Sequence, residues 1–116
     1  MTDFSTAPAH ATVDPRPILD RAIATTGSVI AGVGPDQFSA ATPCPDMDVR
    51  TMLGHLVGVL DRMAALANGD DPFAVVETHS PDDGWVEVWA AAGQRTAATW
   101  RDDALLERPM ALPWIQ

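Results

Sequence analysis

Apolar residues recur at helical spacing in three stretches of this chain. The clearest stretch follows Asp48, a short acidic side chain that can cap the free N–H groups at the start of a helix. Asn68 and Gly69 then favour the left-handed conformation that ends helices. We therefore predict a helix over residues 49–68. Its apolar stripe consists of Leu53, Leu56, Val57, Leu60, Ala64 and Ala67.

His55 lies on the flank of this stripe, beside Met52 and Val59. An imidazole at this position can point along the seam between two helices, so His55 is the candidate functional residue of the stretch. We predict that its side chain contacts the bundle interior and not bulk water. Two interpretations remain open at this point: a ligand, or a core histidine satisfied by one hydrogen bond.

The first helix is predicted to begin at the Asp14-Pro15-Arg16-Pro17 segment and to run to about Val33. An acidic cap followed by proline in the first turn is typical of a helix start, because the first-turn N–H groups need no partner within the helix. Gly27, in its interior, is either a point of close helix approach or a merely tolerated glycine. The predicted inner face contains Leu19, Ile23, Thr26, Ile30 and Val33, flanked by Ile18, Ala22 and Val29.

A third helix is predicted from Ser80 as cap and Pro81 in the first turn, with its end near Asp102. Tryptophans at such spacing are more often core residues than a binding box, so we expect Trp85 to pack inside. We expect the same of the residues on or near one face of this helix, which are Val88, Trp89, Ala92, Thr96, Thr99 and Trp100.

The connections carry few large apolar residues. Phe38 is the apolar anchor of the 34–47 linker, and residues 73–76 are expected to pack back on the core. Cys44 precedes the second helix, where a thiol can have a depressed pKa; it is interpreted either as a small buried residue or as a reactive thiol. Residues 105–116 are predicted to be loop or short extended chain.

Composition narrows the functional classes. The net charge of −9, without any lysine, argues against nucleic acids and acidic membrane surfaces as partners. No apolar run reaches membrane-spanning length and no signal peptide is visible, while a single cysteine fits a reducing cytoplasm. The acidic pairs, which fall at predicted helix ends or turns and are expected to serve as caps, are Asp70-Asp71, Asp82-Asp83 and Asp102-Asp103.

With 116 residues the chain is long enough for one domain. We predict a flexible leader over residues 1–13 and a helical domain over residues 14–116. His10 falls in the leader and is interpreted as a solvated tail histidine. His79 precedes the third helix and is interpreted as a surface residue.

Three motifs resemble the N-terminal domain of mycothiol-dependent maleylpyruvate isomerases, within the DinB-like superfamily of metal-binding helix bundles. They are the T-P-C-P-D-x-D-V-R entry to the second helix, the L-x-x-H-L-V segment inside it, and the later L-P-W. The resemblance covers roughly Pro17 to Trp114. It implies a four-helix bundle that holds a divalent metal between its helices, with His55 matching the first metal ligand.

The resemblance further implies zinc or nickel as the metal and a mycothiol-type thiol as cosubstrate. The family's remaining ligands belong to a fourth helix that follows the L-P-W turn, and this chain ends there. We therefore expect an all-α antiparallel bundle made of the first three helices. One histidine cannot hold a catalytic ion tightly, so metal binding is expected to be weak.

Two functional readings follow. The first is a metal-binding domain of a thiol-dependent isomerase or transferase that acts on a small molecule. The alternative is a non-catalytic binding or oligomerisation module, or a truncated remnant. A bundle without its fourth helix exposes apolar surface, so we expect self-association. The residues expected near the uncovered surface are Leu56, Leu60, Val88 and Trp89.

Overall fold

The computed structural model describes residues 13–77 and 83–110, and these residues form α-helices and short 3-10 turns. The described residues contain no strand; Ala41 and Asp48 form an isolated bridge. The predicted all-α class is confirmed. No helix in the described ranges combines the length and apolar character needed to cross a membrane. The elements are α1 (Arg16–Ala31), η1 (Pro35–Gln37), α2 (Val49–Asn68), η2 (Pro72–Ala74), α3 (Trp85–Thr99) and η3 (Asp103–Leu106).

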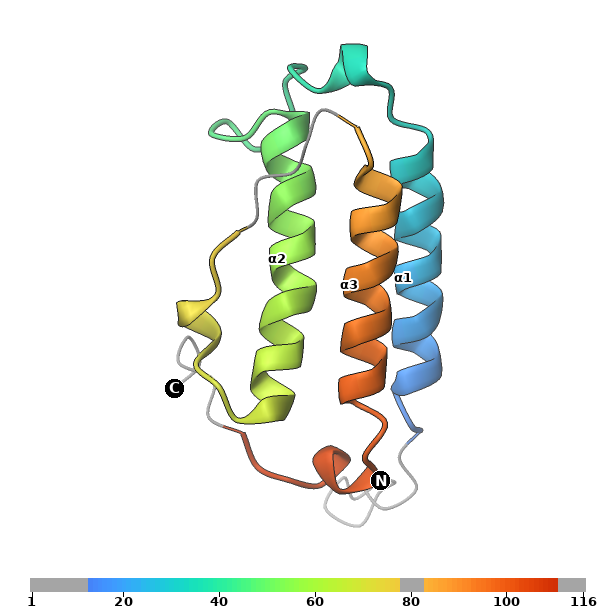
Figure 1. Cartoon of the computed structure of the whole chain (residues 1–116), viewed down its shortest axis with the longest axis vertical. Helices are drawn as coiled ribbons and strands as arrows, with labels where there is room; N and C mark the ends of the chain where they lie inside the picture. Colours follow the sequence, from blue (N-terminus) through green and yellow to red (C-terminus); the bar gives the residue numbers. More distant parts are fainter. Residues whose placement is uncertain (1–12, 78–82, 111–116) are drawn as a thin grey trace, which may run out of the picture.

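The three helices lie side by side, with α3 packed against both α1 and α2 (Figure 1). Helix α1 runs antiparallel to the other two, but α2 and α3 run in the same direction. Thr96 donates to the carbonyl of Leu60, and Trp100 donates to the carbonyl of Met63. The paired residue numbers rise together on the two helices, as they must when helices run in the same direction. The expected antiparallel order of successive helices therefore does not hold between α2 and α3. Residues 69–77 run back alongside α2, and α3 begins at the same end of the bundle as α2.

The helix starts and ends differ from the prediction where glycines intervene. Helix α3 begins at Trp85 and not at Pro81, because Gly84 precedes it in the left-handed conformation with φ of 87°. The predicted cap Ser80 lies outside the described residues. Helix α1 ends at Ala31, where Gly32 follows, two residues before the predicted end. The expected acidic cap of α1 is wrong by one residue, because the N-cap is Pro15, which has no capping side chain. Asp14, one residue earlier, accepts from the backbone N–H of Arg16.

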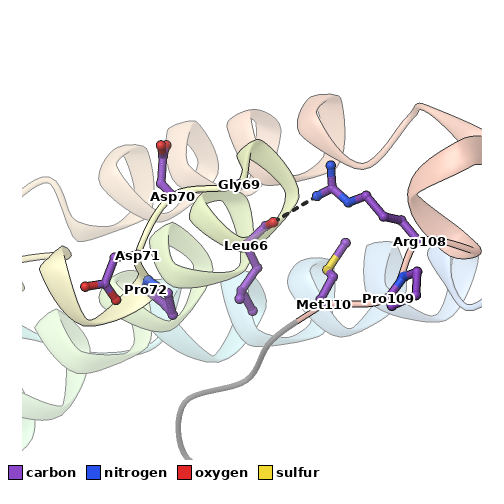
Figure 2. Close-up of a pocket in the computed structure, with 8 residues that line it drawn as sticks. All are labelled: Leu66, Gly69, Asp70, Asp71, Pro72, Arg108, Pro109 and Met110. Atoms are coloured by element: carbon purple, nitrogen blue, oxygen red, sulfur yellow. Dashed lines mark hydrogen bonds between the residues drawn. The ribbon is translucent and has the colours of Figure 1, made fainter.

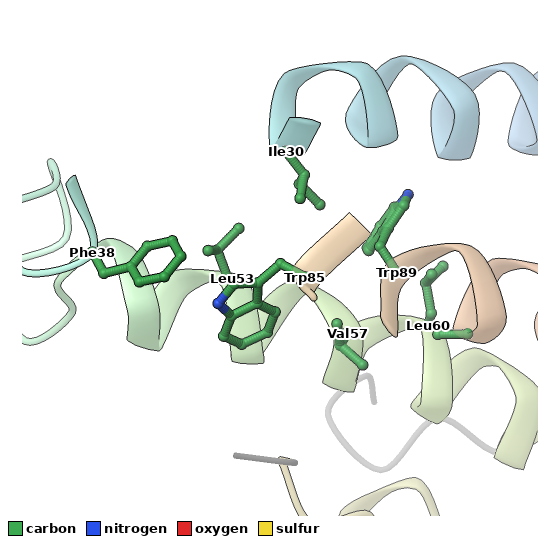
Figure 3. Packing of buried hydrophobic residues seen from close by; sticks show 8 residues of the cluster. Ile30, Phe38, Leu53, Val57, Leu60, Trp85 and Trp89 are labelled. Carbon is green, nitrogen blue, oxygen red and sulfur yellow. The ribbon is translucent and has the colours of Figure 1, made fainter. Parts of the chain in front are cut away.

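The core lies where the three helices meet, at the level of the η1 linker (Figure 3). Phe38 anchors the linker there as predicted, and Trp85 and Trp89 pack inside. The expectation that Leu60 and Trp89 lie near an uncovered surface is wrong, because α3 seats between α1 and α2 and leaves them 3% and 6% exposed. The buried apolar cluster comprises Ile30, Phe38, Leu53, Val57, Leu60, Trp85, Trp89 and Ala92.

Small residues set the close approach of α1 and α3. A Cβ atom added at Gly27 would lie 3.2 Å from Trp89 Cδ1, and one added at Gly93 would lie 2.7 Å from Ile23 Cγ2. The Trp89 indole can therefore lie against the α1 backbone, where its Nε1 donates to the carbonyl of Ile23 at 2.9 Å. Of the two interpretations of Gly27, the structure supports close approach.

Arg16 ties the start of α1 to the end of α3. Its guanidinium pairs with Asp14 and with Asp103, both at 2.7 Å, and donates to the backbone carbonyls of Trp100 and Arg101. The hydrogen bonds that Arg16 donates to the carboxylates of Asp14 and Asp103 raise the pKa of its guanidinium. The contacts of Arg16 with Trp100, Arg101 and Asp103 each join residues more than eighty positions apart, so they close this end of the bundle.

The segment after α2 does not pack on the core as predicted. Phe73 and Val76 are 62% and 81% exposed, and Pro72 is the residue that is buried instead. Asp71 caps the η2 turn by accepting from Phe73 N, and Asp102 accepts from Ala104 N at the start of η3. These two carboxylates act as caps, as expected of the acidic pairs. The η2 turn therefore packs against α2 with Pro72 buried, while the Phe73 side chain is mostly exposed.

Replacing Gly93 with alanine is expected to destabilise the domain, because the new Cβ would meet Ile23 Cγ2 at 2.7 Å. Alanine gains about 1 kcal/mol over glycine in a helix, whereas overpacking costs about 1–3 kcal/mol and a β-branched neighbour has little freedom to turn. We expect a net loss of roughly 1 kcal/mol in urea unfolding. Gly32→Ala is the control, since its Cβ would meet nothing closer than 3.4 Å. A Gly93→Ala variant as stable as the control would contradict this packing.

Candidate functional site

Helix α2 carries the predicted site residue, and its ends are fixed by local chemistry. Asp48 accepts from the backbone N–H of Thr51 at 2.8 Å, as predicted for a cap. Gly69 ends the helix in the left-handed conformation with φ of 80°. The predicted bounds of this helix are confirmed. His55 therefore projects from a regular helix two turns from its capped start.

His55 lies at the edge of the bundle, in a small polar cluster. Its Nδ1 is 2.8 Å from Glu77 Oε1, and Arg62 Nη2 is 3.3 Å from the same oxygen. The three side chains are partly shielded, with exposed fractions of 38% for His55, 35% for Glu77 and 25% for Arg62. The imidazole is thus neither enclosed in the apolar core nor free in water.

The electrostatics of the cluster determine which ring nitrogen of His55 carries the proton. The hydrogen bond with His55, followed by that from Arg62, lowers the pKa of Glu77 against the opposing effect of burial. An ionised carboxylate only accepts hydrogen bonds, so Nδ1 of His55 is the donor in this pair. When the ring is neutral, Nε2 carries the lone pair, and it has no hydrogen-bond partner among the described residues.

The described residues do not supply a complete metal site. Catalytic zinc sites use three protein ligands with an open position. Within residues 13–77 and 83–110, no three His, Cys, Asp or Glu side chains gather closely enough to hold an ion. His10 and His79 lie outside these ranges. The described residues around His55 therefore do not form a three-ligand set by themselves.

Cys44 is exposed, so the interpretation of it as a small buried residue is wrong. The loop before α2 closes on its own hydrogen bonds: the Thr42 hydroxyl donates to the carbonyl of Met47 at 2.7 Å and accepts from Cys44 N. This turn satisfies the loop without burying the thiol. Nothing in these contacts connects Cys44 with His55.

A cavity of about 410 Å³ lies at the other end of α2, away from this cluster (Figure 2). Arg108 reaches across it and donates to the carbonyls of Leu66 and Ala67 in the last turn of α2, where helix carbonyls lack intrahelical partners. The Leu66 carbonyl also accepts from the backbone N–H of Gly69. The guanidinium therefore acts as a cap for α2.

Sequence reasoning did not single out Glu77 or Arg62. Arg62 is seven positions after His55 on α2, which is a same-face spacing, but one arginine on a helix face is an ordinary solvent group. Glu77 reaches the cluster from the segment beyond η2, and no periodic pattern extends into that segment. The sequence signal was two glycines, Gly54 and Gly58, inside an otherwise strong helix pattern, and it did not distinguish Gly58 as the one beneath Glu77.

The fold and the cluster define a helical domain with a carboxylate-oriented histidine on its second helix. The sequence matches the family described as the mycothiol maleylpyruvate isomerase N-terminal domain over residues 19–113. The chain belongs to this family. Searches of curated proteins and of solved structures gave no significant match.

The cap of α2 is expected to be sensitive to acid. The hydrogen bond from Thr51 N lowers the pKa of Asp48 below its ordinary value of 3.8. The ionised form is thus favoured by folding, and its contribution is present above pH 3.8 and lost as the pH falls through the lowered folded value. Asp48→Asn keeps a capping oxygen without titrating. We expect the melting temperature of the wild type to exceed that of Asp48→Asn at neutral pH and the difference to vanish in strong acid; a constant difference would contradict this.

Proposed function

We propose that this domain serves a thiol-dependent isomerase or transferase and that His55 is its functional side chain, as one ligand of a divalent metal ion. The observation that supports this is the Nδ1–H···Glu77 hydrogen bond, which leaves the Nε2 lone pair available. A histidine that binds a metal commonly donates its other ring N–H to a carboxylate in this way. Family membership supports a mycothiol-type thiol as cosubstrate and the cytoplasm, where such thiols stay reduced, as location.

The proposal is limited to the contribution of one imidazole. Because the described residues offer no group of three ligands, the other donors must come from elsewhere. Zinc and nickel are proposed as the ion because both metals bind imidazole well. No reaction step is assigned to the ion. What the described chain does is to hold the ring in one orientation, partly shielded, beside a cation–carboxylate pair.

A second candidate function is a binding or assembly module that associates with a second copy of the chain. Helices α1 and α2 both pack on α3, but they make no comparable contact with each other. The open side between them is here termed the α1–α2 seam. Leu19 and Met63 line an apolar hollow of about 210 Å³ in it. Leu56 is half-buried beside them, and helical spacing places Val59 on the α2 rim and Ile18 and Val29 on the α1 rim, all exposed.

The metal proposal predicts weak binding that depends on His55. In calorimetric titration with zinc or nickel, we expect low affinity without a fixed stoichiometry, because one imidazole provides too few donors. His55→Ala should weaken the binding further, whereas His10→Ala, the control, should leave it unchanged. Equal binding by wild type and His55→Ala would refute the assignment of His55, and one tight site per chain would show that the ligand set is larger than inferred.

The assembly proposal predicts a dimer or larger species in sedimentation equilibrium at micromolar concentration. Val59→Glu places a charge on the α1–α2 seam and is expected to shift the chain toward monomer. Val76→Glu makes the same change at an exposed valine outside the helices and should leave the association state unchanged. A monodisperse wild-type monomer with a cooperative thermal transition would show that the three helices need no partner.

A further inference from the structure

Glu77 crosses the surface of α2 where the helix has no side chain. A Cβ atom added at Gly58 would lie 2.9 Å from Glu77 Cγ and 3.2 Å from Arg62 Nη1. Gly58 is three positions after His55 and four before Arg62, so all three share one face of the helix. The stem of Glu77 occupies the space that a side chain at this position would fill.

This arrangement explains an unfavourable residue choice. Glycine in a helix interior weakens the helix relative to alanine, and Gly58 is buried in the middle of α2. The space it leaves lets one carboxylate oxygen receive both His55 Nδ1 and Arg62 Nη2. Arg62 donates to the same carboxylate oxygen as His55, so the orientation of Glu77 does not depend on the imidazole alone.

We propose that Glu77, admitted over α2 by Gly58, is the positioning residue for His55. It fixes the ring in the Nδ1–H tautomer and directs the Nε2 lone pair away from α2, toward an electron-pair acceptor such as a divalent cation. This inference rests on the proposed function for its purpose, since an oriented lone pair matters only if His55 acts as a ligand. The tautomer itself is a property of the unliganded chain and can be measured without any metal.

The experiment is ¹⁵N NMR of the histidine side chains at about pH 8, above the ordinary histidine pKa of about 6.5. We compare the wild type with Glu77→Gln, Gly58→Ala and the control Gly32→Ala. In the wild type and the control, the Nδ1–H form of His55 should predominate. Glu77→Gln should reduce it, because an amide can accept from Nδ1–H or donate to an unprotonated Nδ1 and so does not select one tautomer. Gly58→Ala should do the same by displacing Glu77.

The fold of each variant is checked by its backbone amide spectrum, and Glu77→Gln carries the test alone if Gly58→Ala does not fold. A wild-type ring in the Nε2–H form, or a tautomer unchanged in a folded Glu77→Gln variant, would overturn the proposal. Zinc titration of the same samples should show weaker binding to Glu77→Gln than to the wild type. A tautomer that depends on Glu77, in a chain that binds no zinc, would refute the metal proposal and leave the positioning role intact. Zinc binding together with a tautomer that does not change in Glu77→Gln would refute the positioning role and leave the metal proposal intact.

Discussion

The fold depends on one close contact, the approach of α3 to α1 across two glycines. With hydrogen atoms as the side chains of Gly27 and Gly93, the indole of Trp89 lies flat enough to reach a backbone carbonyl of α1. This hydrogen bond satisfies the indole N–H of Trp89, which would cost free energy if it were buried without a partner. It also places α3 deep enough to bury Leu60 from the other side. The core therefore closes around α3, and both outer helices are positioned by it.

The same principle of a missing side chain operates on α2, with a different result. On α3, Gly93 leaves space for a side chain of α1 and so allows the two helices to pack closely. On α2, Gly58 leaves space for the polar side chain of Glu77. The cluster of His55, Arg62 and Glu77 is formed over this gap, at the edge of the apolar core. Within this cluster, Glu77 and Arg62 are the groups that hold the imidazole at the edge of the core.

Sequence patterns predicted α2 almost completely, because its cap, stripe and terminal glycine all point to the same bounds. They failed for the start of α3, where the signal at Ser80 and Pro81 competed with the left-handed Gly84. The direction of α3 was also beyond local patterns, since it depends on which partner buries each tryptophan. His55 was found by its place on a helix, but Glu77 is twenty-two positions away in an irregular segment, and pairings of that kind carry no periodic signature.

The parallel course of α2 and α3 has a consequence for how the chain folds. An antiparallel hairpin forms its contacts between residues close in sequence, but here the two helices can align only after the chain has travelled back along α2. The contact of Trp89 with Ile23 spans 66 positions, and that of Arg16 with Asp103 spans 87. The entropy of closing such loops must be overcome before their contacts stabilise anything. This domain should therefore fold more slowly than an up-and-down bundle of the same size, with α1 among the last elements to dock.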